Sequence, residues 1–307
     1  MENYVDTSGD VGVDTSGAGN GETVLLFKDA IPDSAKSSLG KLTVNKATTV
    51  QPVSLLRLGV FTPSSRANGA DGPELDVSSS LSNLEIARSE GYTDVKITGP
   101  QLNYFHDFRC WVAIIHSFST NPDALKGNKI RLKFTEFGEK CGYPSKRFDS
   151  RLRKEIGSSL TRIRSKTITF TKNPGAKKCR VTGLLNNAEF NAETDIIILE
   201  ADGRLWDLYA SDHLTLLRRK PLDALARNET AQAIYTYFEA LPEPPAPVTF
   251  ERLRSRLLMH GRIADQNRKI RIALETLEQI GYLKYRFSKK GSKESSIVII
   301  NRNPKLY

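Results

Sequence analysis

The sequence predicts an α+β fold made of two tandem units of the same design. Three observations lead to this prediction. The hydrophobic spacing alternates between the periods of helices and strands, one order of elements occurs twice, and 307 residues suffice for about two domains of ordinary size. That order is a long helix, a short helix, a turn, a basic helix and a β-hairpin, which is typical of the winged helix, a helix-turn-helix with an added hairpin.

The N-terminal region is expected to contribute little to the core. Residues 1–22 are rich in Gly, Ser and Asp and poor in large apolar residues, so we expect a disordered tail that extends over residues 1–45. A second stretch, at 62–80, is expected to be a loop because of its many Gly, Ser and Pro residues. Between them, residues 48–63 are apolar enough to pack but too few for a domain.

The first unit is expected to span residues 46–211. Its basic helix has apolar residues in steps of four and three, which indicates one buried face. The expected elements are a strand and turn at 94–102, a helix at 103–119, a strand at 129–134, a short helix with Thr135 as its N-cap that ends at Gly142 and Pro144, the basic helix at about 144–164, hairpin strands at 167–172 and 179–190, and a further strand at 195–202.

The second unit is expected to span residues 212–307 and to repeat this order. A proline-rich spacer, which should be stiff, separates its long helix from the helix-turn-helix. The expected elements are a strand at 214–219, a long helix at 221–241, the spacer at 242–247, a helix at 248–259, a turn with Gly261, a basic helix at 264–283, and a closing hairpin with a Lys-Gly-Ser tip.

The positive charge is concentrated outside the N-terminal third. The chain carries a net charge of +10. Residues 1–100 hold 8 basic and 13 acidic side chains, and the remaining residues hold 37 and 22. Residues 251–307 alone have 14 basic against 5 acidic side chains. This distribution favours a polyanionic partner, although ribosomal and membrane-surface proteins share it with DNA-binding proteins.

Helical periodicity places the basic residues of both helices opposite their apolar faces. A helix-turn-helix puts the N-terminal part of such a helix in the major groove, where Arg and Lys can donate to guanine and neutralise phosphates. The DNA-contacting residues expected on the first basic helix are Lys146, Arg147, Ser150, Arg151, Arg153 and Lys154, and those expected on the second are Gln266, Asn267, Arg268, Lys269 and Arg271.

Both expected hairpin tips are basic as well. Either basic helix alone could be an ordinary solvated face. Two such helices, each after a turn and before a basic tip, favour binding to double-stranded DNA over coincidence. The tip residues are Lys172, Lys177 and Lys178 in the first unit and Lys289, Lys290 and Lys293 in the second.

Nothing in the sequence indicates an enzyme. It contains no GxxxxGK[ST] nucleotide-binding loop, and the combined RxH/HxxR catalytic constellation of tyrosine recombinases does not accompany its late tyrosines. The histidines are scattered and the three cysteines form no CxxC pair, so no metal, cofactor or disulfide is expected. Cys141 lies near basic residues that could lower the pKa of its thiol, but a buried helix-end cysteine is the simpler interpretation.

The sequence also lacks the signals of a membrane or secreted protein. Its most apolar helix, at 106–118, is too short and too polar to span a bilayer. The first residues have neither the basic nor the apolar region of a secretory signal. We therefore expect a cytoplasmic protein without a membrane partner.

Four stretches of the chain are distinctive. They are VQPVSLLRLGVFTP, DVKITGPQL followed by FHDFRCWVAIIHSFS, KFTEFGEKCGYPS, and ETAQAIYTYFEALPEPPAPVTFERLRSRL. In order, over about residues 48–300, they closely resemble the RepA replication initiators of RepFIB-type plasmids. Through them the chain is similar to the wider group of iteron-binding initiators that includes RepE, the pi protein and TrfA. The N-terminal 47 residues and the SSRANGADGPELD segment lie outside the resemblance.

The resemblance implies a bacterial protein with two winged-helix domains that bind repeated sequences, called iterons, at a plasmid origin. It implies that such proteins open the origin and recruit the host initiator DnaA and the replicative helicase. It also implies a homodimer, in equilibrium with the monomer, that represses its own promoter at an inverted repeat. We expect the first unit to carry dimerisation, because residues 106–118 and 195–209 hold more apolar side chains than one small winged helix needs.

Two other functions compete with this interpretation. One is a transcriptional repressor without an initiation role, and the less favoured one is a recombinase or relaxase. A repressor usually needs one basic helix per subunit and a strong dimer surface. Two unlike basic helices in one chain would let a monomer contact two successive major-groove segments, which favours the initiator.

Overall fold

The described part of the chain covers most of both predicted units. The computed structural model describes residues 46–63, 75–76, 94–121, 128–171, 179–191, 193–203, 209, 214–290 and 293–303. The predicted disordered tail at 1–45 and most of the predicted loop at 62–80 lie outside these ranges.

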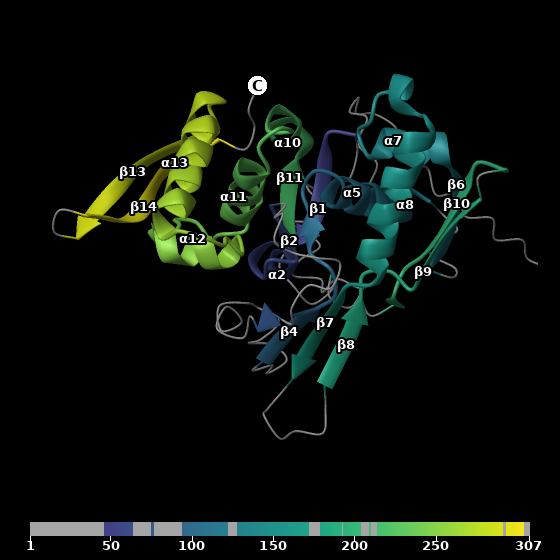
Figure 1. Ribbon diagram of the computed structural model, residues 1–307, viewed down its shortest axis with the longest axis horizontal. Coiled ribbons are helices and arrows are strands. Elements are labelled where there is room, and N and C mark those ends of the chain that lie inside the picture. Colours follow the sequence, from purple (N-terminus) through teal and green to yellow (C-terminus); the bar gives the residue numbers. More distant parts are fainter. Residues whose placement is uncertain are drawn as a thin grey trace, which may run out of the picture.

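The first set of elements lies at one end of the molecule (Figure 1). It is called the first repeat here and consists of α5 (Asp107–Thr120), β6 (Lys129–Lys133), α7 (Phe134–Lys140), α8 (Ser150–Arg164), β9 (Asn187–Asn191) and β10 (Ile196–Glu200). Its strands form an antiparallel sheet in the order β6-β10-β9. Strand β6 therefore pairs with the last strand of the hairpin.

The second repeat lies at the other end (Figure 1). It consists of α11 (Glu229–Glu239), β12 (Val248–Thr249), α12 (Phe250–Arg256), α13 (Ile263–Gln279), β13 (Leu283–Lys290) and β14 (Lys293–Arg302). Its sheet order is β12-β14-β13. The strand between the first two helices again pairs with the last strand of the hairpin, so the two repeats share element order and strand pairing.

The predicted hairpin of the first unit forms, but it is not the counterpart of the hairpin in the second unit. Strands β7 (Thr167–Thr171) and β8 (Cys179–Gly183) do form a hairpin, but β7 pairs with β4 (Asp94–Thr98) over five residues and belongs to a separate sheet, β3-β4-β7-β8, in which β3 is Leu75–Asp76. The hairpin that matches β13–β14 is β9–β10. The predicted strand at 179–190 accordingly divides into β8 and β9.

Three further differences from the sequence-based boundaries concern helix starts, and side-chain capping explains two of them. The basic helix begins at Ser150 instead of about residue 144, because the Asp149 side chain accepts a hydrogen bond from the Leu152 amide and residues 145–147 form a separate 3-10 turn. The predicted helix at 221–241 divides into α10 (Arg219–Ala224) and α11, because Asn228 caps α11 in the same way. The N-cap of α7 is Lys133 and not Thr135.

A segment from the N-terminal side joins the two repeats. Strand β1 (Thr48–Pro52) pairs with β11 (Leu214–Arg218), and β2 (Phe61–Thr62) pairs with β5 (Leu102–Asn103). Between β1 and β2, helix α2 (Val53–Arg57) buries four of its five residues. Because β1 precedes residue 211 and β11 follows it, the elements of the two predicted units interlock, and the boundary near residue 211 stays a prediction.

One continuous apolar core runs through both repeats and this joining segment. Apolar residues that suggested a dimer surface lie in it: Trp111, Ile197 and Leu199 are fully buried. Leu205 and Trp206, also part of that prediction, lie outside the described residues. Ile196 and Ile198, which belong to the same prediction, are only partly buried. Dimerisation through the first unit stays a prediction.

Candidate nucleic-acid interface

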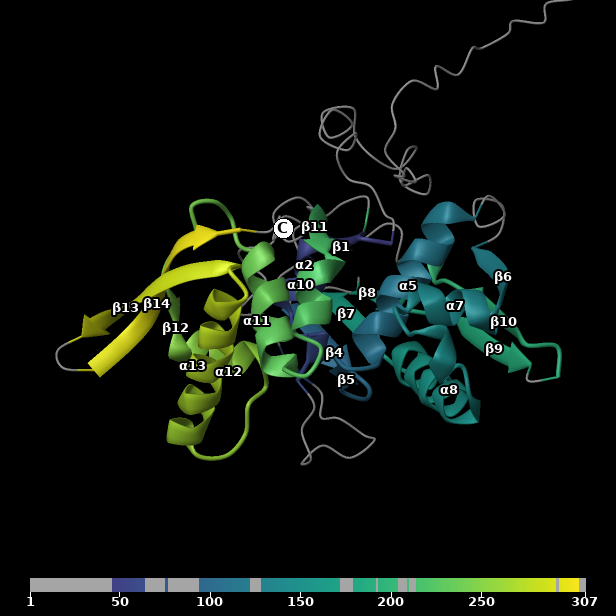
Figure 2. The ribbon, with the colours of Figure 1, turned by 90° about the horizontal axis from the view of Figure 1, so that it is seen from above.

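Helices α8 and α13 lie along the same side of the molecule, one in each repeat (Figure 2). Strands β1 and β11 lie towards the opposite side (Figure 2). The two basic helices could therefore face one extended ligand together.

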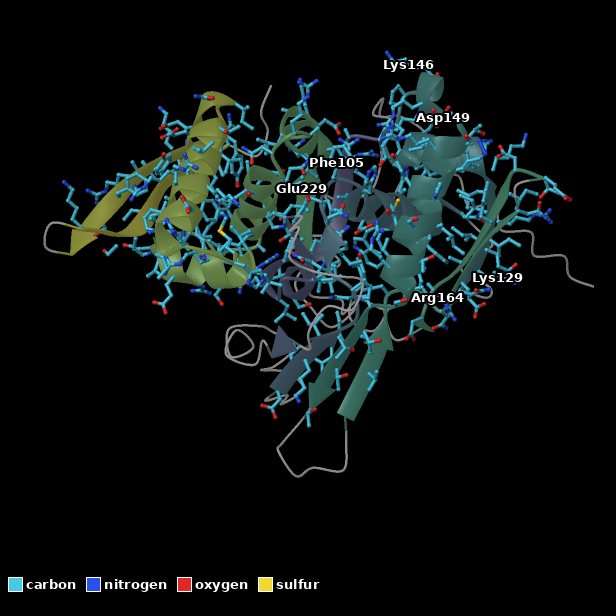
Figure 3. The ribbon with its side chains drawn as sticks, viewed as in Figure 1. Phe105, Lys129, Lys146, Asp149, Arg164 and Glu229 are labelled. Atoms are coloured by element: carbon cyan, nitrogen blue, oxygen red, sulfur yellow. The ribbon has the colours of Figure 1, made fainter. Side chains whose placement is uncertain are left out.

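Helix α8 has one apolar and one polar face, as its sequence predicts. It buries Leu152, Ile156, Leu160 and Ile163. Figure 3 shows Lys146 and Asp149 at one end of α8 and Arg164 near the other. Lys146 lies in the 3-10 turn that precedes the helix, and it is exposed together with Ser150, Arg151 and Lys154.

Glu155 balances part of the positive charge on this face. Its carboxylate lies 3.3 Å from Arg147 Nη2 and 3.2 Å from Arg151 Nε. The Arg151 side chain is 84% exposed, so water screens this pair and it contributes only about 0.3–0.5 kcal/mol. Arg147 also lies over the Tyr143 ring, 5.3 Å from its centroid. Both guanidiniums are held on the surface and are partly neutralised.

Arg153 has its partners inside the fold. Its Nη2 lies 2.5 Å from Asp195 Oδ1 at the turn of the β9–β10 hairpin, and its guanidinium lies 4.3 Å from the centroid of the Phe134 ring. An arginine held by a carboxylate and an aromatic face is well placed to fix the hairpin against α8. The structure therefore gives Arg153 a structural role, and its predicted contact with DNA stays a prediction.

Helix α13 presents the less neutralised surface. It follows a turn in which Gly261 has a φ of +96°, a conformation that favours glycine. Its buried face consists of Gln266, Ile270, Ala273, Leu274 and Leu277. On the opposite face Arg268 and Lys269 are exposed, and neither forms an ion pair with any residue that the structure describes.

Gln266 and Asn267 are occupied within the protein. Gln266 is buried, and its Nε2 donates to the Gly261 carbonyl at 2.7 Å. Asn267 Oδ1 accepts a hydrogen bond from Arg254 Nη1 at 2.7 Å. These bonds fix the turn before α13 and its packing on α12, and they occupy Gln266 Nε2 and Asn267 Oδ1. The base contacts that the sequence suggested for these residues stay a prediction.

Arg271 packs against aromatic rings. Its guanidinium lies 4.8 Å from the Phe250 ring and 4.9 Å from the Phe287 ring. The first repeat has the same arrangement, with Arg153 over Phe134 and the Phe190 ring 5.6 Å from Phe134. If the two arginines are equivalent, Arg268 and Lys269 correspond to Ser150 and Arg151. The second repeat then has one more cation than the first at these two positions.

The hairpin tips are only partly described. Lys172, Lys177 and Lys178 lie outside the described residues. In the second repeat, Lys289 is exposed, while Lys290 and Lys293 pair across the hairpin and their side chains are not among those described. The described turn of β9–β10 carries Glu193 and Asp195, so the hairpin that matches the second one has an acidic turn instead of the basic tip that was predicted.

Several exposed cations near α13 were not singled out from the sequence. Arg262 is the N-cap residue of α13, Arg252 lies on α12, and Lys284 and Arg286 lie on β13. The alternation of Lys284 and Arg286 with Tyr285 and Phe287 is a period-two pattern that could have indicated one charged face of a strand.

Burial shifts the pKa values of His106 and Cys141, which lie beneath this surface. It lowers the pKa of His106, so the imidazole beside Glu155 is neutral at neutral pH. It raises the pKa of the Cys141 thiol well above its ordinary value, which is opposite to the activation that nearby arginines could have produced. Cys110 and Cys141 are both free and buried.

No helix among the described residues combines the length and apolar character needed to cross a membrane. Within the same residues, no group of three or more His, Cys, Asp and Glu side chains is placed to hold a metal ion.

The fold, with its two repeats, is similar to that of domains 2 and 3 of RctB. The match to that crystal structure has a TM-score of 0.52 at 13% identity and covers 82% of this chain and 98% of the other. At this identity the match shows a shared fold only. No protein-family model matches the chain.

Sequence comparison is more specific, and it shows that the chain belongs to the RepA family of replication proteins. It is 45% identical over 281 residues to a Replication protein RepA of Escherichia coli, covering 92% of this chain and 97% of the relative. It is 41% identical over 282 residues to RepFIB replication protein A of Escherichia coli strain K12, covering 89% and 85%. The resemblance drawn from the four sequence stretches is thereby confirmed.

Proposed function

We propose that this protein initiates plasmid replication by binding repeated duplex DNA at the origin, with α8 and α13 in successive segments of the major groove. Membership of the RepA family supports the role in replication. The observation that carries the mode of binding is the placement of α8 and α13 on one side of the molecule, each with its cations opposite a buried face.

Each repeat is inferred to be a winged-helix module. In that arrangement the N-terminal part of the third helix enters the major groove and the hairpin lies along the backbone. Arg268 then has the planar donor pair that guanine O6 and N7 accept. Lys269 and, on the hairpin, Lys289 would neutralise phosphates, a contribution that depends on salt but not on sequence.

The second repeat is proposed to be the anchor. Its two outward cations on α13 are not paired with any carboxylate that the structure describes, whereas Glu155 competes with phosphate for Arg147 and Arg151. The first repeat would contribute through Lys146, Lys154 and the partly neutralised arginines. The proposed function is binding to DNA through charge and shape, and it includes no catalysed reaction.

Family membership also motivates three finer proposals. They are opening of the origin, recruitment of the host initiator DnaA and the replicative helicase, and repression of the protein's own promoter by a dimer at an inverted repeat. These activities need surfaces beyond α8 and α13.

Footprinting of the full chain on DNA that flanks its own gene tests the proposal. We expect protection of direct repeats spaced by one or two helical turns, with two major-groove segments protected per repeat. Arg268→Ala should lose this protection at concentrations where Lys129→Ala, which removes one exposed positive charge from β6, keeps it. Protection of a single inverted repeat alone would support a repressor, and absence of any protected site would contradict the proposal.

A further inference from the structure

An exposed aromatic ring stands at the junction of the two repeats. Phe105 follows β5 and precedes α5, and its exposed fraction is 42%. It is the aromatic member of a small set of exposed large hydrophobic residues among those that the structure describes, which are Phe105, Val181, Ile263, Ile272 and Ile300. Aromatic side chains are enriched in interfaces relative to the rest of a protein surface.

The neighbouring residue on one side fixes Phe105 to the second repeat. The backbone amide of Tyr104 donates to Glu229 Oε2 at 3.0 Å, and Glu229 is the first residue of α11. The Tyr104 hydroxyl lies 2.6 Å from Thr236 Oγ1 within the same helix. Figure 3 shows Phe105 and Glu229 close together between the two repeats.

The neighbouring residue on the other side fixes it to the first repeat. His106 Nδ1 lies 2.8 Å from the Tyr143 hydroxyl, and its Nε2 lies 3.9 Å from the carboxylate of Glu155 on α8. The Phe105 ring meets the His106 ring edge to face, with centroids 4.6 Å apart at 87°. A ring held in this way loses little rotational freedom when it binds.

Glu155 connects His106, which packs against Phe105, to the proposed DNA-binding face. The same carboxylate contacts Arg147 and Arg151. The Phe105 ring is thus linked through His106 and Glu155 to Arg147 and Arg151. It also lies next to the start of α11 in the second repeat. On a protein with α8 and α13 on one side, this position is between the two basic helices.

A duplex that offers major-groove segments to both helices turns its minor groove towards the protein between them. Apolar side chains, including Phe, enter minor grooves, wedge between neighbouring base pairs and partly unstack them. We propose that Phe105 is such a wedge, inserting into the minor groove between the two major-groove segments. This inference rests on the proposed function and assigns one residue to the distortion of the bound duplex.

The distortion can be measured with the full chain and a duplex that contains one repeat protected by the wild-type protein. Adenine is replaced by the fluorescent analogue 2-aminopurine at the base step midway between the two protected major-groove segments. Unstacking raises the fluorescence of this base. We expect the wild-type protein to raise it at least two-fold, and a probe placed outside the repeat to stay unchanged.

Phe105→Ala should abolish the rise in fluorescence and weaken binding by about 5- to 50-fold, which corresponds to about 1–2.3 kcal/mol, while both major-groove segments remain protected at higher protein concentration. Phe105→Leu, which keeps an apolar wedge, should restore part of the rise. Val181→Ala removes a comparably exposed apolar side chain from β8 and should change neither quantity.

The outcomes separate this inference from the proposed function. Protection of the repeat by Phe105→Ala with an undiminished fluorescence rise would overturn the wedge and leave the DNA-binding proposal intact. An unchanged fluorescence on wild-type binding would do the same. Failure of the wild-type protein to protect any repeat would overturn both.

Discussion

Helices α8 and α13 occupy matching places in the two repeats but differ in how their cations are balanced. On α13, Arg268 and Lys269 face outwards without a carboxylate partner among the described residues. Beside α8, Glu155 lies within salt-bridge distance of both Arg147 and Arg151. The two repeats thus share a fold but differ in how much of their positive charge is neutralised within the protein. We expect the second repeat to contribute more to DNA affinity than the first.

The largest effect on binding is expected from the second repeat. Arg268→Ala with Lys269→Ala should weaken binding to a protected repeat by about 2–4 kcal/mol, because a base contact and a phosphate contact are lost together. Arg147→Ala with Arg151→Ala should cost clearly less, since Glu155 already competes for those cations. Fluorescence anisotropy measures both affinities. Equal losses, or a larger loss from the first repeat, would reverse the ranking.

The connection between the repeats is expected to depend on a buried arginine. Arg256 of α12 donates to the Leu56 carbonyl from Nε at 2.9 Å and to the Phe61 carbonyl from Nη1 at 3.2 Å. Arg256→Met leaves these acceptors unsatisfied and should lower the free energy of unfolding by about 3 kcal/mol. Urea unfolding measures this free energy. Arg252→Met, at an exposed site on the same helix, should change it by less than about 0.5 kcal/mol, and equal effects would contradict the assignment.

The first repeat should carry a distinct dependence of stability on pH. Burial lowers the pKa of Lys166, just after α8, from 10.5 to about 8, while its Nζ donates to the Pro100 carbonyl at 3.0 Å. Between pH 8 and 10.5 the unfolded chain binds more protons at this lysine than the folded chain, so stability rises with pH, by about 1–3 kcal/mol.

Lys166→Met isolates this contribution. The difference in unfolding free energy between the wild type and this variant should be constant below pH 8 and should change in favour of the wild type as the pH rises towards 10.5. A difference that stays flat over the whole range would show that Lys166 keeps its ordinary pKa in the folded protein.

The smallest expected effect has the opposite sign. Glu155→Gln removes a negative charge beside the proposed interface and frees Arg147 and Arg151 for phosphates. We expect binding to tighten by about 0.5–1 kcal/mol, in line with the modest strength of exposed ion pairs. Glu275→Gln, on an exposed site of α13, is the matched variant in the second repeat. Weaker binding by Glu155→Gln would show that Glu155 positions the arginines instead of masking them.

Local sequence patterns predicted the elements of the second repeat well. The expected start of α13 is one residue from the observed start, and Ile270 and Leu277 are buried as the period of 3.6 requires. The ion pair of Arg151 with Glu155 also follows from a spacing of four residues on a helix. These features depend on residues close together in the chain.

Features that depend on distant residues were not predictable in this way. Nothing local indicates that β6 pairs with β10 and not with the hairpin at 167–183, and the two strands are separated by more than sixty residues. The Arg153–Asp195 and Arg256–Leu56 contacts bring together residues 42 and 200 positions apart. Because such contacts withdraw arginines from the surface, the composition of a basic helix overstates the charge that it offers to DNA.

The salt dependence of binding tests most directly whether both repeats contact the duplex. If the full chain meets about 6–10 phosphates, the logarithm of its affinity for one protected repeat should fall with the logarithm of salt concentration at a slope of about −5 to −9. Arg268→Ala with Lys269→Ala should make this slope less steep by about 1–2. A wild-type slope shallower than about −2 would contradict simultaneous contact by α8 and α13.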